Sequence, residues 1–155
     1  MIVSSIDALA ELGREMRAAG STVVFTNGVF DILHAGHVTY LQVARSFGDV
    51  LVLGINADDS VRRLKGPERP LNALSDRMIV VDALRCVDYV ISFAQDTPLD
   101  LIRALQPDVL VKGGDYVRET VVGVEDVESW GGRVEIVPLL EGRSTTNLIT
   151  RARTV

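Results

Sequence analysis

The chain has 155 residues, of which 16 are Lys or Arg and 21 are Asp or Glu, so its formal net charge at neutral pH is −5. This acidic balance argues against non-specific binding of nucleic acid, and no apolar run approaches the ~20 residues that a membrane helix requires. The first residues lack the basic start and long apolar stretch of a signal peptide. The single cysteine, Cys86, excludes an internal disulfide and fits a reducing compartment. We therefore expect one cytoplasmic domain that binds neither nucleic acid nor membrane, with Cys86 in its core.

Apolar periodicity predicts alternating helices and strands. Helical spacing predicts a leading helix over 6–19, which Gly20 ends. Continuous apolar runs predict strands at 23–26, 49–56, 87–92, 108–112 and 133–137. Further helices are predicted over 38–47, within 57–75, from an N-cap at Ser75, from an N-cap at Thr97, over 119–130 and after 142–147. Apolar strands separated by helices are typical of a parallel sheet covered on both faces. We therefore predict a single-domain α/β fold, a Rossmann-like, doubly wound parallel five-stranded sheet.

Both histidines of the chain lie between the first strand and the helix that follows it. His34 and His37 are separated by Ala and Gly36. A helix start offers free backbone N–H groups and a partial positive charge, which attract phosphate, and a glycine lets the backbone approach it closely. A lone histidine at such a place is usually a cap or a packed surface residue, and a pair could bind a metal. Two imidazoles within four residues favour a nucleotide phosphate site, because both can hydrogen-bond to phosphate oxygens.

A basic segment follows the second predicted strand. Residues 57–75 contain Gly and Pro, which indicate a mobile loop after a short helix, together with Arg62, Arg63, Lys65 and Arg69. These cations form either a solvated face or an anion-binding surface. We favour anion binding, with Lys65, which precedes Gly66, as the first candidate.

Three distinctive loops follow strands at their carboxyl ends, where ligands bind in doubly wound sheets. They are the loop with both histidines and the loops 113–116 and 142–147. Ser144, Thr145 and Thr146 offer hydroxyl and backbone N–H groups, which suit plain N-capping or a second phosphate clamp. Asp115 could accept a hydrogen bond from a base or sugar, or serve only its turn, and Asp31 could orient its loop or lie near a metal. The common edge predicts one shared site.

No G-x-G-x-x-G follows the first strand, and the chain has no G-x-x-x-x-G-K-[ST]. Residues 26–37 (TNGVFDILHAGH) instead resemble the HxGH signature of the nucleotidyltransferase superfamily, which includes the cytidylyltransferases, and residues 142–146 (GRSTT) are similar to its second signature. Residues 62–70, 111–116 and 144–147 make the likeness closest to the D-glycero-β-D-manno-heptose 1-phosphate adenylyltransferases. The likeness covers residues 22–153 as a catalytic core, behind the leading helix of residues 1–20. Many bacteria carry this enzyme behind a sugar kinase, and this chain resembles the stand-alone form.

The resemblance implies that ATP and the heptose 1-phosphate react to ADP-heptose and pyrophosphate, for the synthesis of a lipopolysaccharide core precursor. It implies that His34, His37 and Lys65 are catalytic, that a Mg²⁺ ion is held mainly by the nucleotide phosphates, and that a homodimer is possible. The nucleotide-binding residues that it implies are Thr26, Asn27, Gly28, Phe30, His34, Gly36, His37, Gly113, Asp115, Ser144, Thr145 and Thr146. The substrate-binding residues that it implies are Asn27, Asp31, Lys65, Arg69, Arg77, Lys112 and Asp115.

The sequence leaves two other functions open. A cytidylyltransferase acting on glycerol 3-phosphate or a similar alcohol phosphate shares both signatures, and an assay with ATP against CTP separates it from an adenylyltransferase. A non-catalytic nucleotide-sensing module would bind nucleotide without releasing pyrophosphate, although binding alone does not need both histidines.

Overall fold

A computed structural model of the chain describes residues 1–114, 116–138 and 145–153. Five parallel strands form one sheet in the order β3-β2-β1-β4-β5. They are β1 (Val23–Gly28), β2 (Val50–Asn56), β3 (Tyr89–Phe93), β4 (Val109–Gly113) and β5 (Arg133–Val137). The predicted α/β fold is confirmed, and every predicted strand is present with ends that differ by at most two residues.

The strand order reverses beside β1, because β2 and β3 extend the sheet on one side of it and β4 and β5 on the other. A crevice forms at the carboxyl ends of the strands at such a point. Here the pairing of β1 with β4 covers only Val24 with Val109 and Phe25 with Leu110. Beyond that pairing the two strands are bridged by side chains, so the ladder opens toward its carboxyl end.

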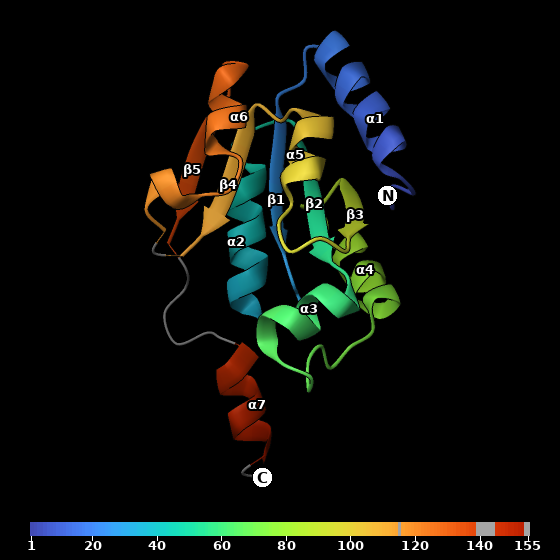
Figure 1. Cartoon of the computed structure of the whole chain (residues 1–155), viewed down its shortest axis with the longest axis vertical. Coiled ribbons are helices and arrows are strands. Elements are labelled where there is room, and N and C mark those ends of the chain that lie inside the picture. Colours follow the sequence, from blue (N-terminus) through green and yellow to red (C-terminus); the bar gives the residue numbers. More distant parts are fainter. Residues whose placement is uncertain (115, 139–144, 154–155) are drawn as a thin grey trace.

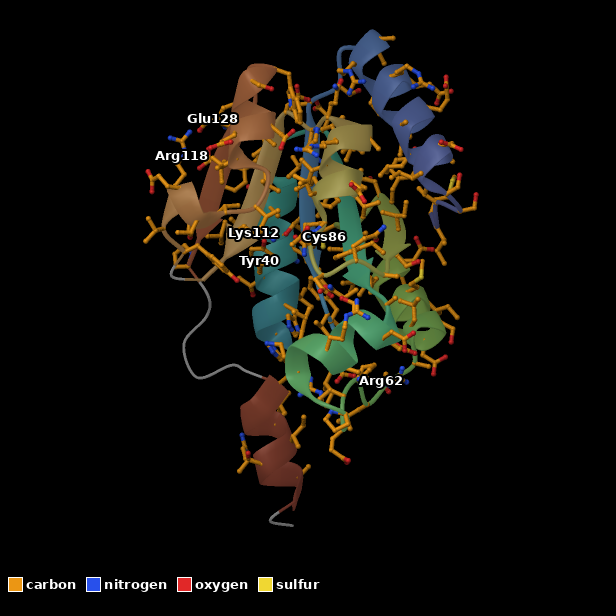
Figure 2. All side chains as sticks on the ribbon, in the orientation of Figure 1. Tyr40, Arg62, Cys86, Lys112, Arg118 and Glu128 are labelled. Atoms are coloured by element: carbon orange, nitrogen blue, oxygen red, sulfur yellow. The ribbon has the colours of Figure 1, made fainter. Side chains whose placement is uncertain are left out.

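Three buried polar groups bridge this opening. The Thr26 Oγ1 lies 2.6 Å from the Tyr40 hydroxyl, and these two oxygens lie 2.9 and 3.2 Å from the Val111 carbonyl oxygen, so two hydroxyl protons are shared among three contacts. Figure 2 labels Tyr40 near Lys112, the residue that follows Val111 on β4. Burial raises the pKa of Tyr40, and the hydrogen bond with Thr26 opposes that rise. The bridge therefore joins β1, β4 and the helix that carries Tyr40 with neutral hydroxyl groups.

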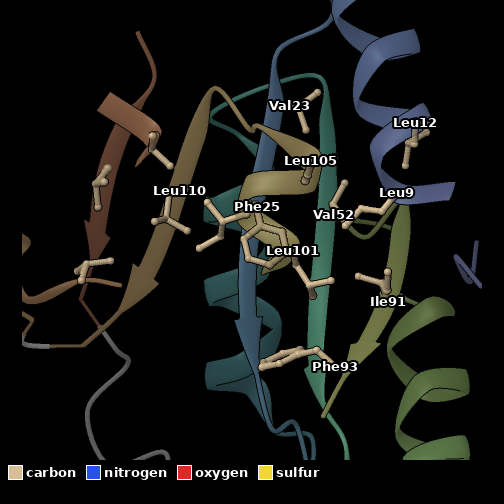
Figure 3. Close-up of a cluster of buried hydrophobic side chains, with 14 residues drawn as sticks. Leu9, Leu12, Val23, Phe25, Val52, Ile91, Phe93, Leu101, Leu105 and Leu110 are labelled. Atoms are coloured by element: carbon tan, nitrogen blue, oxygen red, sulfur yellow. The ribbon is translucent and has the colours of Figure 1, made fainter. Parts of the chain in front are cut away.

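Helices cover both faces of the sheet (Figure 1). One layer contains α1 (Ile6–Ala18), α5 (Leu99–Leu105) and α6 (Val124–Ser129), and the other contains α2 (Ala35–Arg45) and α4 (Leu74–Asp82). Alternating strand residues serve the two layers, since Phe25 and Leu110 pack with α1 and α5, whereas Val24 and Val111 pack with α2 and α4. Figure 3 shows the first of these clusters, with Leu9, Leu101 and Leu105 against the sheet. Helices bury both faces of the sheet, which explains why the strands are apolar along their whole length.

Three further elements complete the fold. They are α3 (Asp58–Lys65), a 3₁₀ turn (Arg118–Thr120) and α7 (Thr145–Arg153). In Figure 1, α3 and α7 lie beyond the carboxyl ends of the strands. Cys86 is half-buried beside the α2 and α4 cluster, and burial raises the pKa of its thiol, as expected of a core residue.

Several helix boundaries differ from the sequence expectations, and α2 begins at Ala35 rather than at residue 38. The N-cap of α4 is Ala73 rather than Ser75, because the Ala73 carbonyl already accepts hydrogen bonds from the amides of residues 76 and 77. The N-cap of α5 is Pro98 rather than Thr97. The helix expected over 119–130 is divided into the 3₁₀ turn and α6 by Gly123, whose φ is 90°. The positive φ at Gly123 favours glycine, and a Cβ there would also lie 2.8 Å from the Cδ1 of Ile102 of α5.

Candidate active site

A cavity of about 430 Å³ lies at the carboxyl ends of β1 and β4. It contains most of the residues that the sequence predicted for the site, although they come from separate elements. Its lining residues are Asn27, Gly28, Val29, Phe30, Asp31, His37, Tyr40, Asn56, Lys65, Arg69, Lys112, Gly113, Tyr116 and Thr145. The predicted convergence of the three loops at one edge of the sheet is therefore seen for the loops after β1 and β4 and for the first residue of α7.

The two histidines stack at the start of α2. His34 is the N-cap residue, with an extended backbone, and His37 is the third residue of the helix. Because the two positions lie one turn apart, the rings face each other with centroids 3.8 Å apart and an interplanar angle of 20°. The Phe30 ring packs on the His37 ring, with their centroids 5.2 Å apart. Gly36 is buried in the first turn of α2. His37 lines the cavity, and His34 and Phe30 fix the orientation of its ring.

His37 is neutral at physiological pH. Burial and the neighbouring charge of His34 lower the pKa of His37 to about 4, although a hydrogen bond with the backbone of Ile32 raises it. A neutral imidazole has a single N–H, so a hydrogen bond from His37 to a phosphate oxygen would replace the one to the Ile32 backbone. His37 stands at a helix start whose backbone N–H groups also attract anions. The start of α2 can therefore bind phosphate without any change in protonation.

Asp31, which follows β1, binds residues 69–72 of the segment after α3 through hydrogen bonds. Its carboxylate is almost fully buried and accepts hydrogen bonds from Arg69 Nε at 2.6 Å and from the backbone amides of Leu71 and Asn72 at 2.8 and 2.9 Å. Burial alone would raise the pKa of Asp31, but these hydrogen bonds and the Arg69 charge lower it overall. Both carboxylate oxygens are occupied. Of the two roles left open by the sequence, the contacts fit orientation of the loop.

Four described residues predicted to contact ligand are not among the lining residues: His34 and Gly36 at the start of α2, and Arg77 and Thr26 in buried contacts below the cavity. Arg77 is 2% exposed. Its guanidinium donates to the carbonyls of Asn72, Val29 and Asn56 at 3.0, 2.7 and 2.9 Å, and to the Asp58 carboxylate at 2.7 Å. Thr26 is fully buried in the bridge between β1 and β4. The structure places Arg77 and Thr26 as supports of the loops that line the cavity.

The basic segment divides into cations that face the cavity and cations that do not. Arg62 pairs with Asp59, and Arg63 pairs with Asp96, at the outer surface of α3. Lys65, the last residue of α3 rather than part of a loop, lines the cavity. The solvated-face interpretation therefore fits Arg62 and Arg63. Lys65 and Arg69 line the cavity, and of these two Arg69 is paired with Asp31.

Lys112 enters the cavity from β4. Its ammonium group donates to the Asn27 Oδ1 of β1, and burial lowers its pKa to about 8. The last residue of β4, Gly113, lies beside it in the lining. Lys112 is therefore cationic at neutral pH, in a place where water compensates its charge poorly.

Sequence comparison matches a known family over the part of the chain that forms the cavity. Residues 25–151 match the cytidylyltransferase-like family.

The chain belongs to this family.

The bifunctional protein HldE of Geotalea uraniireducens (strain Rf4) is 58% identical over 152 residues, which make up 98% of this chain and 31% of that protein. HldE of Syntrophotalea carbinolica (strain DSM 2380 / NBRC 103641 / GraBd1) is 59% identical over 145 residues, 94% of this chain and 30% of that protein. This cytidylyltransferase-like chain thus spans under a third of the length of these relatives.

Two solved structures share the fold. A lipopolysaccharide core biosynthesis protein from Thermoplasma volcanium GSS1 has a TM-score of 0.65 and 27% identity, and the match covers 80% of this chain and 100% of that one. A pantoate-beta-alanine ligase from Francisella tularensis, complexed with beta-gamma ATP and beta-alanine, has a TM-score of 0.65 and 13% identity, and the match covers 99% and 77% of the two chains. The second likeness is one of fold alone.

Four lining residues of this cytidylyltransferase-like site were not predicted from the sequence. They are Val29, Tyr40, Asn56 and Tyr116. Tyr40 follows His37 by three residues, so helical spacing could have placed it on the same face. Asn56 is the last residue of β2, and Tyr116 follows β4 in a loop already expected at the site. For Asn56 and Tyr116, the signal in the sequence was their position at the ends of strands.

Some predicted residues fall outside this description. Asp115 and Ser144 lie outside the described residues, and Thr146 belongs to α7 with a side chain that is also outside them. Within the described ranges, no helix is long and apolar enough to cross a membrane. The same ranges contain no group of three His, Cys, Asp or Glu side chains arranged to hold a metal ion.

Proposed function

We propose that this chain is an adenylyltransferase that joins ATP and D-glycero-β-D-manno-heptose 1-phosphate, giving ADP-heptose and pyrophosphate for the lipopolysaccharide core. The observation that carries the proposal is the cavity, which combines a neutral His37 at a helix start with two lysines. The high identity to HldE proteins and the likeness to a lipopolysaccharide core biosynthesis protein support this choice of substrate.

The proposed reaction is a displacement at the α-phosphorus of ATP. An oxygen of the sugar phosphate forms a bond to this phosphorus, and the bond from the phosphorus to the bridging oxygen of the β-phosphate breaks. The electron pair of that bond leaves with pyrophosphate. Negative charge gathers on phosphoryl oxygens, so positioning and charge stabilisation supply most of the catalysis, and no covalent intermediate is needed.

Each part of the cavity has a role in this proposal. The start of α2 and His37 bind the phosphates of ATP at the reacting centre, and Gly36 lets them approach the backbone. His34 holds the His37 ring. Lys65 neutralises developing charge from the end of α3. From the resemblance we also propose that Ser144, Thr145 and Thr146 clamp the β- and γ-phosphates and that Asp115 orients the nucleoside, and of these four residues the described lining contains Thr145.

A Mg²⁺ ion held mainly by the ATP phosphates completes the proposed site. The one carboxylate among the described lining residues, Asp31, is already occupied by Arg69 and two backbone amides. This donor set fits an ion that takes its ligands from phosphate oxygens and water, as Mg²⁺ commonly does. When bound, the ion would neutralise charge on the triphosphate.

A cytidylyltransferase acting on glycerol 3-phosphate is the second candidate, because the family match itself names cytidylyltransferases. The test is pyrophosphate release from ATP and from CTP, each with the heptose 1-phosphate and with glycerol 3-phosphate. We expect rapid release only with ATP and the heptose 1-phosphate. A preference for CTP and glycerol 3-phosphate would replace the proposal with the second candidate. Nucleotide binding without release from any pair would show a nucleotide-sensing module.

The proposal includes a cytoplasmic location, where ATP is available, and a homodimer. Light scattering of the purified chain measures the oligomeric state, and a mass of one chain at micromolar concentration would contradict the dimer. Cell fractionation tests the location.

A further inference from the structure

Lys112 and His37 reach the cavity from opposite faces of the sheet. Strand residues alternate between the two faces, so Lys112 follows Leu110, which packs in the α1 and α5 layer. Asn27 follows Phe25 into the same layer. A Cβ built on Gly54 would lie 3.2 Å from Asn27 Cβ and 3.4 Å from Leu101 of α5, which places Asn27 on that side. His37 instead belongs to α2, in the other layer.

The charge of Lys112 is not balanced by any carboxylate of the described residues. Its hydrogen-bond partner is the neutral amide of Asn27. Arg69 in the lining and Arg77 below it differ from Lys112, because Arg69 pairs with Asp31 and Arg77 with Asp58. A partly buried ammonium group without a counter-charge is costly in the free protein, and burial lowers its pKa to about 8. An anionic ligand group beside Lys112 would remove this cost.

The chemistry of the reaction indicates which anion this is. In an in-line displacement, the attacking oxygen and the leaving pyrophosphate lie on opposite sides of the α-phosphorus. If the start of α2 binds the phosphates of ATP from one face, the incoming phosphate arrives from the other face, where Lys112 and Asn27 lie. We infer that Lys112 binds the phosphate group of the acceptor sugar phosphate, with Asn27 as the positioning residue that holds its ammonium group. This inference rests on the proposed function.

The substitution Lys112→Met tests the assignment, because it keeps the length of the side chain and removes the charge. Steady-state rates are measured with ATP and the heptose 1-phosphate varied separately. We expect the KM for the heptose 1-phosphate to rise by about 10- to 100-fold, the loss typical of a hydrogen bond to a charged group, and the KM for ATP to stay unchanged. Lys112→Arg, which keeps the charge, should recover part of the loss.

A matched control is Arg62→Met, which removes an exposed cation that pairs with Asp59 away from the cavity. It should leave both KM values unchanged. Calorimetric titration of each variant with the heptose 1-phosphate alone gives the same comparison without turnover, so a variant too slow to assay still yields a result.

Thermal unfolding separates ligand binding from a structural role. Removal of an uncompensated cation should leave the Tm of Lys112→Met at or above that of the wild type. Asn27→Asp places a carboxylate beside Lys112, where it competes with the acceptor phosphate, so acceptor affinity should fall without loss of stability. A structural brace would instead lose stability in Lys112→Met and affect both substrates alike.

Three outcomes would overturn the inference. A raised KM for ATP with an unchanged KM for the acceptor would assign Lys112 to the nucleotide and leave the proposed function intact. Unchanged acceptor affinity in Lys112→Met would remove Lys112 from recognition altogether. A wild-type chain that neither binds nor converts the heptose 1-phosphate would overturn the proposed function, and the inference would fall with it.

Discussion

Lys65, Lys112 and Arg69 line the cavity and Arg77 lies buried below it, and these four cations differ in their partners. Arg69 and Arg77 each pair with a carboxylate and lie against backbone that they hold in place. Lys65 and Lys112 form no ion pair with any described residue, and both line the cavity. Since all four carry the same charge, we propose that pairing separates the cations that hold the fold from those that can bind a ligand.

The contrast has a physical basis in side-chain chemistry. A guanidinium group offers five donors in a planar fork, so Arg77 can bind three carbonyls and a carboxylate at once. An ammonium group is a compact point charge on a flexible stem, which suits a phosphate that arrives and leaves. The comparison predicts losses of stability for the arginines and losses of turnover for the lysines.

The largest expected effect is the loss of stability in Arg77→Met. The substitution leaves three carbonyls and the Asp58 carboxylate without their donor, so the free energy of unfolding should fall by about 3 kcal/mol. Denaturant unfolding measures it. Arg63→Met, in which an exposed pair is lost, should change stability by less than ~1 kcal/mol. Equal stability of the two variants would contradict the structural role of Arg77.

The next effect is on turnover in His37→Ala. Loss of one preorganised donor at the phosphates typically costs ~10²–10³-fold in rate, so kcat should fall by about that factor with the fold retained. His37→Asn, which keeps an N–H donor, should recover part of the rate. Pyrophosphate release measures kcat and circular dichroism checks the fold. A folded His37→Ala variant with wild-type turnover would remove this histidine from the mechanism.

A smaller effect is expected from Lys65→Ala. The exposed side chain supports no other described residue through an ion pair or hydrogen bond, so the Tm should change little, whereas kcat should fall by roughly 10- to 100-fold. Arg62→Ala, three residues earlier on α3, is the matched control and should keep its turnover. If Lys65→Ala is as active as this control, Lys65 belongs to the solvated face.

The smallest effect concerns acid stability and Asp31. Its pKa lies below the model-compound value of 3.8, so the folded protein binds the proton less readily than the unfolded chain. The stabilisation is therefore complete above about pH 4 and is lost as the pH falls through the lowered pKa. Asp31→Asn should be less stable than the wild type at pH 7, and the gap should narrow below pH 4. A gap that is constant with pH would show that the carboxylate charge contributes nothing.

The parts that could be predicted from sequence are those with a local physical cause. Apolar runs predicted the five strands, and the loop with both histidines predicted the edge of the sheet at which the cavity lies. Pairing across the fold could not be predicted in the same way. The sequence predicted Arg77 and Lys112 alike as cations that bind substrate. The hydrogen bonds from Arg77 to the carbonyls of Asn72, Val29 and Asn56 appear only in the folded structure.

Helix boundaries set by tertiary contact were also beyond the sequence. The helix expected over 119–130 is divided at Gly123, which has a left-handed backbone and lies against Ile102 of α5, 21 residues away in the chain. In the sequence, Tyr40 looks like any core residue of a helix. Its contacts with Thr26 and Val111 depend on the separation of β1 and β4 beyond their short pairing, which the sequence does not reveal.

The central claim is that the cavity at the ends of β1 and β4 binds a nucleoside triphosphate through the start of α2. A crystal structure of the chain with Mg²⁺ and a non-hydrolysable ATP analogue tests it most directly. We predict phosphate oxygens within hydrogen-bond distance of His37 and of the first backbone amides of α2, with Lys112 left free for the second substrate. An analogue bound away from both histidines would contradict the account.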